Sequence, residues 1–294
     1  MKDFRFWGLL PAHLLMMCTL IVPILIIIAV SVSTRGAYGG FEFEFSTDAY
    51  RQILFNEGWS GEMEFNPQYL FIIARTAVLA GLATLICMVL AFPVAYWITL
   101  QSAQMRTLLL FMVTLPFWVS MIVRVYAWLI ILGNDGVIES ALRATGLVED
   151  MDTLLFNNGA MLVGMVYSYI PLMILPVYAS IEKLDRALIE ASHDLYGSRM
   201  TTLRRVILPL CWPGLGAGAI LVFVPCLGTV LEPILLGGGK IMMMGNLIQM
   251  QFGGARNWPF GAAIAITLMC LVMGVLIVNG LRAMRQAQLK AESI

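Results

Sequence analysis

The sequence predicts an all-α, polytopic membrane protein with six transmembrane helices. Three observations predict this fold class. Of the 294 residues, 60% are hydrophobic and only 12% are charged, whereas a soluble globular protein carries roughly 25% charged residues. Several apolar stretches are long enough to cross a bilayer, and Lys and Arg gather in alternate connections between these stretches. Much of the surface is therefore expected to face lipid.

Six stretches satisfy the length of a spanning helix, which needs about 20 mostly apolar residues to cross a hydrocarbon layer about 30 Å thick. The first is too long for the core of a signal peptide and is expected to remain as an anchor. Pro225, Glu232 and Pro233 interrupt the fifth, which is the least regular. The expected helices cover residues 7–32, 70–100, 107–132, 159–181, 214–236 and 260–281.

The distribution of Lys and Arg predicts the orientation, because cytoplasmic segments carry an excess of these residues. With the N-terminus inside, the inside segments hold eleven: Lys2, Arg5, Arg106, Lys183, Arg186, Arg199, Arg204, Arg205, Arg282, Arg285 and Lys290. The outside loops hold five: Arg35, Arg51, Arg143, Lys240 and Arg256. Eleven against five places both termini in the cytoplasm.

The two larger outside loops are acidic. Simple solvation of an exposed loop explains this pattern, and so does a docking surface or a field that attracts a cationic substrate. Both explanations stay open. The acidic residues are Glu42, Glu44, Asp48, Glu57, Glu62 and Glu64 in one loop and Asp135, Glu139, Glu149, Asp150 and Asp152 in the next.

The inside segment over residues 182–213 is longer than an ordinary connection between helices and must have structure of its own. Apolar residues recur in it at helical spacing, at Leu184, Leu188, Ala191 and Leu195. Asp185 is the expected N-cap of this helix and Gly197 its expected stop. A second short helix is expected over residues 200–207, ending before Pro209.

A short amphipathic helix on the inside either lies in the lipid interface or inserts into a groove on a partner protein. An interfacial helix usually presents a polar face rich in Lys and Arg. This helix mixes acidic and basic residues instead, so the sequence favours a protein partner. The charged residues are Glu182, Lys183, Asp185, Arg186, Glu190 and Asp194.

This segment resembles the "EAA" loop of the permease subunits of ATP-binding cassette (ABC) importers. The residues that carry the resemblance are Glu190-Ala191-Ser192, Asp194-Leu195, Gly197 and Ile207-Leu208-Pro209. Two positions depart from the family pattern, which usually has Ala at Ser192 and Gly at Tyr196. Gly197 is expected to supply the tight turn.

Further motifs between residues 70 and 281 resemble the spermidine/putrescine permease branch of this family. They are Pro116-Phe117-Trp118, Arg124-Val125-Tyr126-Ala127-Trp128, Leu132-Gly133 with Gly136, Val166–Pro171, Leu175-Pro176, Leu235–Gly238 and Asn257–Gly261.

The resemblance implies the MetI-like fold of type I importers. Its domains would be an anchor helix with the first outside loop (1–69), a permease core (70–282) with a coupling loop (183–213), and a cytoplasmic tail (283–294). A second permease subunit, a cytoplasmic ATPase dimer, a periplasmic substrate-binding protein and inner-membrane lipid would be its partners. ATP and Mg would bind the ATPase, so this chain would carry no cofactor and no catalytic residue. Coupling to the ATPase would involve Glu190, Ala191, Asp194, Gly197, Leu208 and Pro209.

Four residues are candidates for the substrate pathway. Glu232 is the only carboxylate within an expected span; such an acid faces a cavity or partner by default, and could attract an ammonium group. The alternative is an acid at the outer helix end that reaches the lipid headgroups. Trp118, Tyr126 and Trp128 could hold ammonium groups through cation–π attraction, although membrane interfaces explain such aromatic residues more simply.

Other classes fit less well. Glycines 237–239 before Lys240 lack the spacing of a phosphate loop, and two histidines build neither a metal site nor a triad. A net charge of zero gives no indication of nucleic acid. The five cysteines are expected to be small buried hydrophobic residues. Gly214 with Gly218 suits a permease–permease interface, although such a pattern also arises by chance in a glycine-rich chain.

Rival functions remain for comparison. An ion-coupled secondary transporter would need several buried acids and no docking loop, and a membrane enzyme would need clustered His, Asp or Cys. Within the importer class, an opine or amino-acid-like compound, another small organic cation, iron or a phosphonate could replace a polyamine as the substrate.

Overall fold

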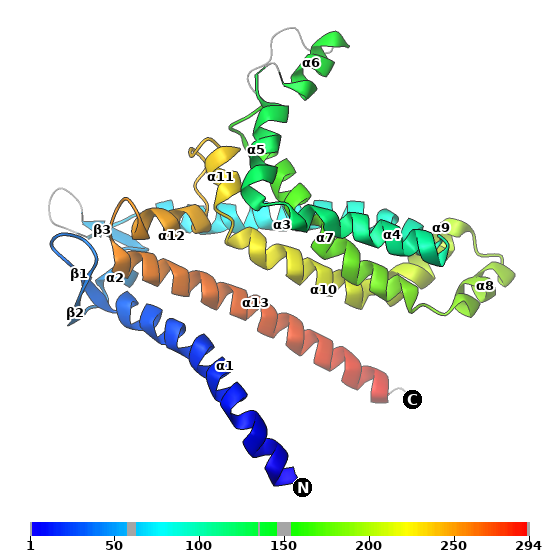
Figure 1. The fold of residues 1–294 in the computed structure, drawn as a ribbon, viewed down its shortest axis with the longest axis horizontal. Coiled ribbons are helices and arrows are strands. Elements are labelled where there is room, and N and C mark those ends of the chain that lie inside the picture. Colours follow the sequence, from blue (N-terminus) through cyan, green and yellow to red (C-terminus); the bar gives the residue numbers. More distant parts are fainter. Residues whose placement is uncertain (1, 58–62, 135, 146–153, 293–294) are drawn as a thin grey trace. The chain divides into compact units, whose positions relative to one another are not determined.

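The computed structural model describes residues 2–57, 63–134, 136–145 and 154–292. The chain divides into two compact units, Met1–Ile72 with Leu247–Ile294, and Ile73–Asn246. Most of the described chain is helical, as Figure 1 shows, which confirms the predicted fold class. Six segments are long and apolar enough to cross a membrane: Leu14–Ser31, Gln68–Thr99, Met121–Ala141 (residue 135 of which lies outside the described residues), Asn158–Glu182, Arg199–Leu227 and Trp258–Leu281.

The first unit is built around two long helices, α1 (Lys2–Ser31) and α13 (Trp258–Glu292), which pack against each other. Two short antiparallel hairpins follow α1, joined by the single turn α2 (Asp48–Arg51). The strands are β1 (Ser33–Arg35), β2 (Phe41–Phe45), β3 (Phe55–Glu57) and β4 (Met63–Phe65). Helix α12 (Met244–Phe252) leads towards α13.

The first hairpin is joined to the start of α13 by side chains. Phe41 stacks on Trp258 with ring centroids 6.0 Å apart, and the guanidinium of Arg35 donates to the carbonyl of Ala255 at 3.1 Å. Strand β2 reads Phe-Glu-Phe-Glu-Phe, an alternation that suits a strand with two different faces.

The second unit contains the remaining helices and all of the predicted coupling loop. The helices are α3 (Gln68–Thr99, from Ile73 onwards), α4 (Ala103–Thr114), a 3₁₀ turn (Leu115–Trp118), α5 (Met121–Leu132), α6 (Val137–Ala144), α7 (Asn158–Glu182), α8 (Arg186–Asp194), α9 (Arg199–Thr202), a π turn (Leu203–Ile207), α10 (Leu208–Leu227) and α11 (Leu231–Leu235).

The third expected helix, over residues 107–132, is wrong as a continuous element. The chain forms α4, the 3₁₀ turn, and then two non-helical residues, Val119 and Ser120, before α5 begins. Helix α5 points away from the direction of α4 (Figure 1). Pro116 explains the break, because proline has no N–H to donate and its ring crowds the preceding turn.

Two expected boundaries after α7 are also wrong. The expected helix over 200–207 does not end before Pro209: α9, the π turn and α10 follow one another without a gap. Pro209 lies within this continuous run, two residues after the π turn, so it does not end the helix. The expected fifth span, 214–236, ends at Leu227, and Glu232 lies on the separate helix α11.

Helices α7 and α10 form a close contact in the second unit, as Figure 1 shows. Glycines allow this approach: a Cβ at Gly214 would collide with Ser180 and the Pro176 carbonyl, and one at Gly218 would lie 2.6 Å from the Met173 sulfur. The small-residue pattern therefore packs within this chain. Its assignment to a permease–permease interface is wrong.

The cysteines divide into two groups. Cys87, Cys211 and Cys226 are buried, as predicted, whereas Cys18 and Cys270 are exposed on α1 and α13. The prediction is wrong for these two because the apolar helices that carry them leave much of their surface uncovered by the chain itself.

Candidate functional site

Helix α8 is the centre of the predicted coupling loop. The side chain of Asp185 accepts a hydrogen bond from the backbone N–H of Ala187 at 3.0 Å, which confirms it as the N-cap. The predicted apolar stripe is largely uncovered: Leu188 is 46% exposed and Leu195 is 83% exposed. Exposed apolar side chains on a short helix indicate a surface that another molecule covers.

The turn after α8 differs from the expectation for Gly197. The N–H of Tyr196 bonds to the carbonyl of His193, and the N–H of Gly197 bonds to the carbonyl of Ser192, both at 2.9 Å. This pair of bonds defines a Schellman motif, whose left-handed residue is usually glycine. Tyr196 occupies that position with φ of 58°. Glycine is needed at position 197 because the backbone there approaches the Ser192 carbonyl closely: a Cβ would lie 2.5 Å from the carbonyl oxygen.

A hydroxyl pair closes the loop. The hydroxyls of Ser192 on α8 and Thr202 on α9 are 2.9 Å apart and share a hydrogen bond, and Thr202 is only 2% exposed. Ser198 caps α9 through the N–H of Thr201. Ser192, where the family usually has Ala, therefore gains a partner in Thr202, and the two short helices form one compact projection.

The predicted coupling residues lie on the surface of this projection. Glu190, Ala191 and Asp194 are exposed on α8, and Leu208 and Pro209 are exposed in the first turn of α10. Glu190 also lines a pocket of about 340 Å³, which lies between α8 and the ends of α3, α4 and α7. The coupling role of these residues stays a prediction.

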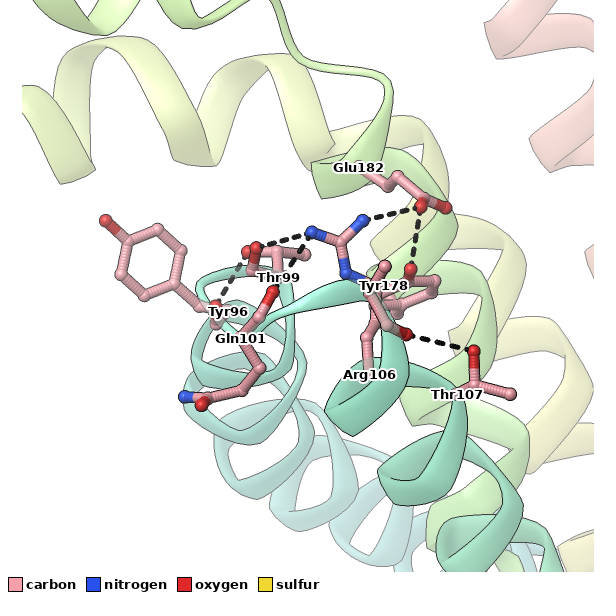
Figure 2. A network of polar contacts seen from close by, with 8 residues as sticks. Tyr96, Thr99, Gln101, Arg106, Thr107, Tyr178 and Glu182 are labelled. Atoms are coloured by element: carbon pink, nitrogen blue, oxygen red, sulfur yellow. Dashed lines mark hydrogen bonds and ion pairs between the residues drawn. The ribbon is translucent and has the colours of Figure 1, made fainter.

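A polar network lies at this pocket, and sequence reasoning missed it (Figure 2). Arg106, in the first turn of α4, donates to Glu182 at the end of α7 at 3.0 Å and to the Thr99 carbonyl at the end of α3, also at 3.0 Å. The hydroxyl of Tyr178 donates to the same Glu182 oxygen at 2.8 Å. Tyr178 and Glu182 are spaced as an i, i+4 pair on a helix, and the sequence alone could have indicated this contact. Their partner Arg106 is 76 residues from Glu182 in the chain, so nothing in the sequence indicated it.

A second group of polar residues lies on α5, on α7, on α11 and in the turn before α11, and we name it the buried polar cluster: Arg124, Ser168, Tyr169, Thr229 and Glu232. Four of these side chains are buried, and Tyr169 is half-buried. Glu232 is 0% exposed and accepts a hydrogen bond from the hydroxyl of Thr229. The Tyr169 phenol lies beside Thr229, within electrostatic range of Glu232 and Arg124. A carboxylate buried in this way does not reach lipid headgroups, so that alternative for Glu232 is wrong.

Several atoms of the buried polar cluster have no hydrogen-bond partner within the described part of the chain. They are Oε1 of Glu232, Oγ of Ser168, and Nε and Nη1 of Arg124. Each such atom costs about 1–3 kcal/mol when it is buried without a partner. The ring of Phe117 lies 6.0 Å from the guanidinium carbon of Arg124.

The structure does not bring the three aromatic candidates together. Trp118 lies in the 3₁₀ turn before α5 and is 81% exposed. Tyr126 and Trp128 are two residues apart on α5, so they point to different sides of that helix. Trp128 packs edge-to-face on Tyr167 with ring centroids 5.6 Å apart. A shared aromatic surface made by these residues is not present in this arrangement.

The remaining site predictions concern metal sites and the acidic outer loops. No group of three or more His, Cys, Asp or Glu that could hold a metal ion occurs among the described residues. Glu62, Asp135, Glu149, Asp150 and Asp152 of the acidic loops lie outside the described residues.

Comparison with known proteins agrees with this geometry. Residues 89–287 match the family described as "Binding-protein-dependent transport system inner membrane component". The chain is 36% identical to the spermidine/putrescine transport system permease protein PotB of Salmonella typhimurium (strain SL1344), over 93% of this chain and 91% of the relative.

Solved structures show the same fold at low sequence identity. A bacterial ABC transporter involved in import of the acidic polysaccharide alginate has a chain with TM-score 0.73 and 17% identity, which covers 97% of this chain and 96% of its own. The bacterial alginate transporter in complex with an alginate pentasaccharide-bound periplasmic protein gives TM-score 0.72, also at 17% identity, with 94% and 93% covered. The chain belongs to the family of inner membrane components of binding-protein-dependent transport systems, and it is a non-enzymatic, multi-pass permease subunit of an ABC importer.

Proposed function

We propose that this permease subunit imports a polyamine such as spermidine or putrescine. The observation that carries the proposal is the 36% identity to a spermidine/putrescine permease over 93% of the chain. The buried polar cluster fits this substrate class, because its free Glu232 oxygen is an acceptor suited to an ammonium group. The alginate transporters share only the fold and carry no argument about the substrate.

The coupling loop would dock on a cytoplasmic ATPase dimer. Leu188 and Leu195 leave apolar surface open at α8. Glu190, two residues after Leu188, is also exposed but points to a different side of the helix. Helix-in-groove docking uses apolar residues of this kind at helical spacing, flanked by charges that select the partner. ATP and Mg would bind the ATPase subunits, and closure of their dimer would move the loop.

The pore would form between this chain and a second permease subunit, and would open alternately to each side of the membrane. Glu232 is fully buried in the present arrangement, so substrate could reach it only when α5, α7 and α11 separate. Trp118 and Tyr126 are exposed and could contact substrate nearer the pore surface, with Trp128 behind them.

A periplasmic binding protein would deliver the substrate, as the complex of the alginate transporter with its periplasmic protein illustrates for that system. This requires the hairpins of the first unit to face the periplasm and both termini to face the cytoplasm. The excess of Lys and Arg on the inside segments supports that orientation. The division into residues 1–69, 70–282 and 283–294 stays a prediction.

Uptake by the complete transporter tests the proposal. Proteoliposomes that hold this chain, its partner permease, the ATPase and the binding protein should accumulate radiolabelled spermidine or putrescine when ATP is enclosed. Unlabelled polyamine should compete, whereas opines, amino acids, ferric iron and phosphonates should not. ATP-driven uptake of one of these competitors without polyamine uptake would contradict the substrate assignment.

A further inference from the structure

The guanidinium of Arg106 joins three chain segments that meet next to the coupling loop. It bonds to the side chain of Glu182 at the end of α7, and to the backbone carbonyls of Thr99 and Gln101 at the end of α3 and in the turn after it, at 3.0 and 3.5 Å. Figure 2 shows these contacts radiating from one side chain. We name this set, with Tyr178, the Arg106 latch.

The chemistry of the latch favours arginine and a carboxylate. The last carbonyls of a helix have no partner within it and carry partial negative charge, so a cation at the end of α3 is stabilising. The planar guanidinium can satisfy these carbonyls and a carboxylate at the same time, whereas an ammonium group is a single point of charge. Tyr178 holds the Glu182 oxygen in place from one turn earlier on α7.

The latch lies directly before the coupling loop in the chain. Glu182 is the last residue of α7, and the loop helix α8 begins at Arg186. Arg106 and Glu182 also line the pocket of about 340 Å³ that Glu190 and Ile189 of α8 line from the other side. Glu182 and Glu190 are exposed, so the pocket is a hollow at the protein surface, and α8 can move against the latch across it.

One atom of the latch is left over. Nε of Arg106 is buried and has no hydrogen-bond partner among the residues that the structure describes. If the latch had only a stabilising role, this donor would also be expected to have a partner, because an unpaired buried donor is unfavourable. The arrangement seen here therefore leaves Arg106 a bond to gain in another arrangement of the loop.

We infer that Arg106 and Glu182 are positioning residues that transmit movement of the coupling loop to α3 and α4, and so set how much substrate moves for each ATP consumed. The inference rests on the proposed function, since it needs an ATPase that moves the loop. Without the latch, the loop can still bind and trigger the ATPase, but its movement is absorbed in the pocket instead of reaching α3 and α4.

The test compares uptake and ATP hydrolysis in the same proteoliposomes. Glu182→Gln and Arg106→Lys keep the size of each side chain, and Thr107→Val is the matched control: Thr107 is the next residue on α4, and its hydroxyl bonds only within that helix, to Ala103. We expect Glu182→Gln and Arg106→Lys to lower the ratio of substrate moved to ATP hydrolysed about fivefold or more. Thr107→Val should leave the ratio unchanged.

The charge exchange Arg106→Glu with Glu182→Arg should restore part of the ratio relative to either single reversal, because the ion pair is remade. Unchanged ratios in assembled complexes that carry Glu182→Gln or Arg106→Lys would overturn the inference. Loss of assembly in both variants would also overturn it, because the latch would then have a structural role only. Failure of the proposed function has a different signature: an ATPase that neither binds this chain nor responds to substrate in the unaltered complex.

Discussion

The second unit contains two polar groups that differ in how exposed and how well paired their charges are. In the Arg106 latch the charges are partly exposed and paired: the Arg106 side chain is 25% exposed, Glu182 is 45% exposed, and their nearest atoms are 3.0 Å apart. In the buried polar cluster, Glu232 is fully buried and one carboxylate oxygen has no partner in the described chain. The ion pair of the latch holds a geometry although Nε of Arg106 lacks a partner among the described residues, whereas the unpaired carboxylate oxygen of Glu232 favours a rearrangement that supplies its missing bond.

The difference separates two tasks of a transporter. The latch lies beside the loop that is proposed to meet the ATPase, where rigid connection is useful. The buried polar cluster lies between α5, α7 and α11, where the proposed substrate would arrive with positive charge. Damage to the docking surface of the loop should therefore change ATP hydrolysis and uptake together, whereas damage to the latch should lower the uptake per ATP hydrolysed. Damage at the buried polar cluster should change the response to substrate.

The largest effect is expected from Glu190→Arg on α8. Reversing the charge places like charges together at the proposed ATPase interface, which costs several kcal/mol, so uptake should fall about 100-fold or more while the chain stays in the membrane. Substrate-stimulated ATP hydrolysis, measured in proteoliposomes, should fall with it. Arg204→Glu is a control for charge reversal elsewhere in the loop, on the exposed π turn, and should act more weakly. Normal uptake with Glu190→Arg would contradict the coupling role of the loop, and with it the contrast between the loop and the buried polar cluster.

A smaller effect is expected from Glu232→Gln in the buried polar cluster. The substitution keeps the shape and the bond with Thr229 but removes the charge, and a charge-assisted hydrogen bond contributes about 1.5–3 kcal/mol. Uptake at low polyamine concentration should fall about tenfold, with basal ATP hydrolysis retained. Thr229→Val is the control: it removes the donor to Glu232 but keeps the charge, so its effect should be weaker. Equal loss in both variants would assign Glu232 a structural role only.

The smallest effect is expected from Tyr196→Gly after α8. Left-handed backbone costs about 1–2 kcal/mol in a non-glycine residue, so glycine at this position should relieve that strain. Part of the stabilisation is offset, because glycine makes the unfolded chain more flexible and loses more entropy on folding. The midpoint of thermal unfolding in detergent should rise by a few degrees, equivalent to about 0.5–1 kcal/mol. Tyr196→Ala keeps the strain while removing the side chain, so it should not raise the midpoint. A rise of the same size with Tyr196→Ala would show that backbone strain is not the cause.

Much of the fold was predictable because lipid imposes long apolar helices. The helices α3 and α7 begin and end within two residues of their expected positions, 70–100 and 159–181. Their internal prolines, Pro93, Pro171 and Pro176, do not end them, whereas Pro116 marks a true break. Sequence alone does not separate these cases, because neighbouring helices decide whether a proline is accommodated.

The sites were predictable only where the signal is local. Asp185 was identifiable as an N-cap, since its partner is the N–H of Ala187, two residues away. The latch joins Arg106 to Glu182, and the buried polar cluster joins helices α5, α7 and α11. Such pairings depend on which helices become neighbours, and neither hydrophobic periodicity nor motif spacing contains that information. The alternation of Phe and Glu over Phe41–Phe45 is also a local signal, and it forms strand β2.

Cross-linking of the coupling loop tests most directly whether it meets an ATPase. A single cysteine at Ala191→Cys, in a chain whose exposed Cys18 and Cys270 are replaced by serine, would carry a cysteine-to-lysine cross-linker in the complete transporter. The account predicts a covalent adduct with the ATPase subunit, and no such adduct from Tyr38→Cys, which is 97% exposed in the first hairpin. An ATPase adduct from Tyr38→Cys alone, or none from Ala191→Cys in an active transporter, would contradict the account.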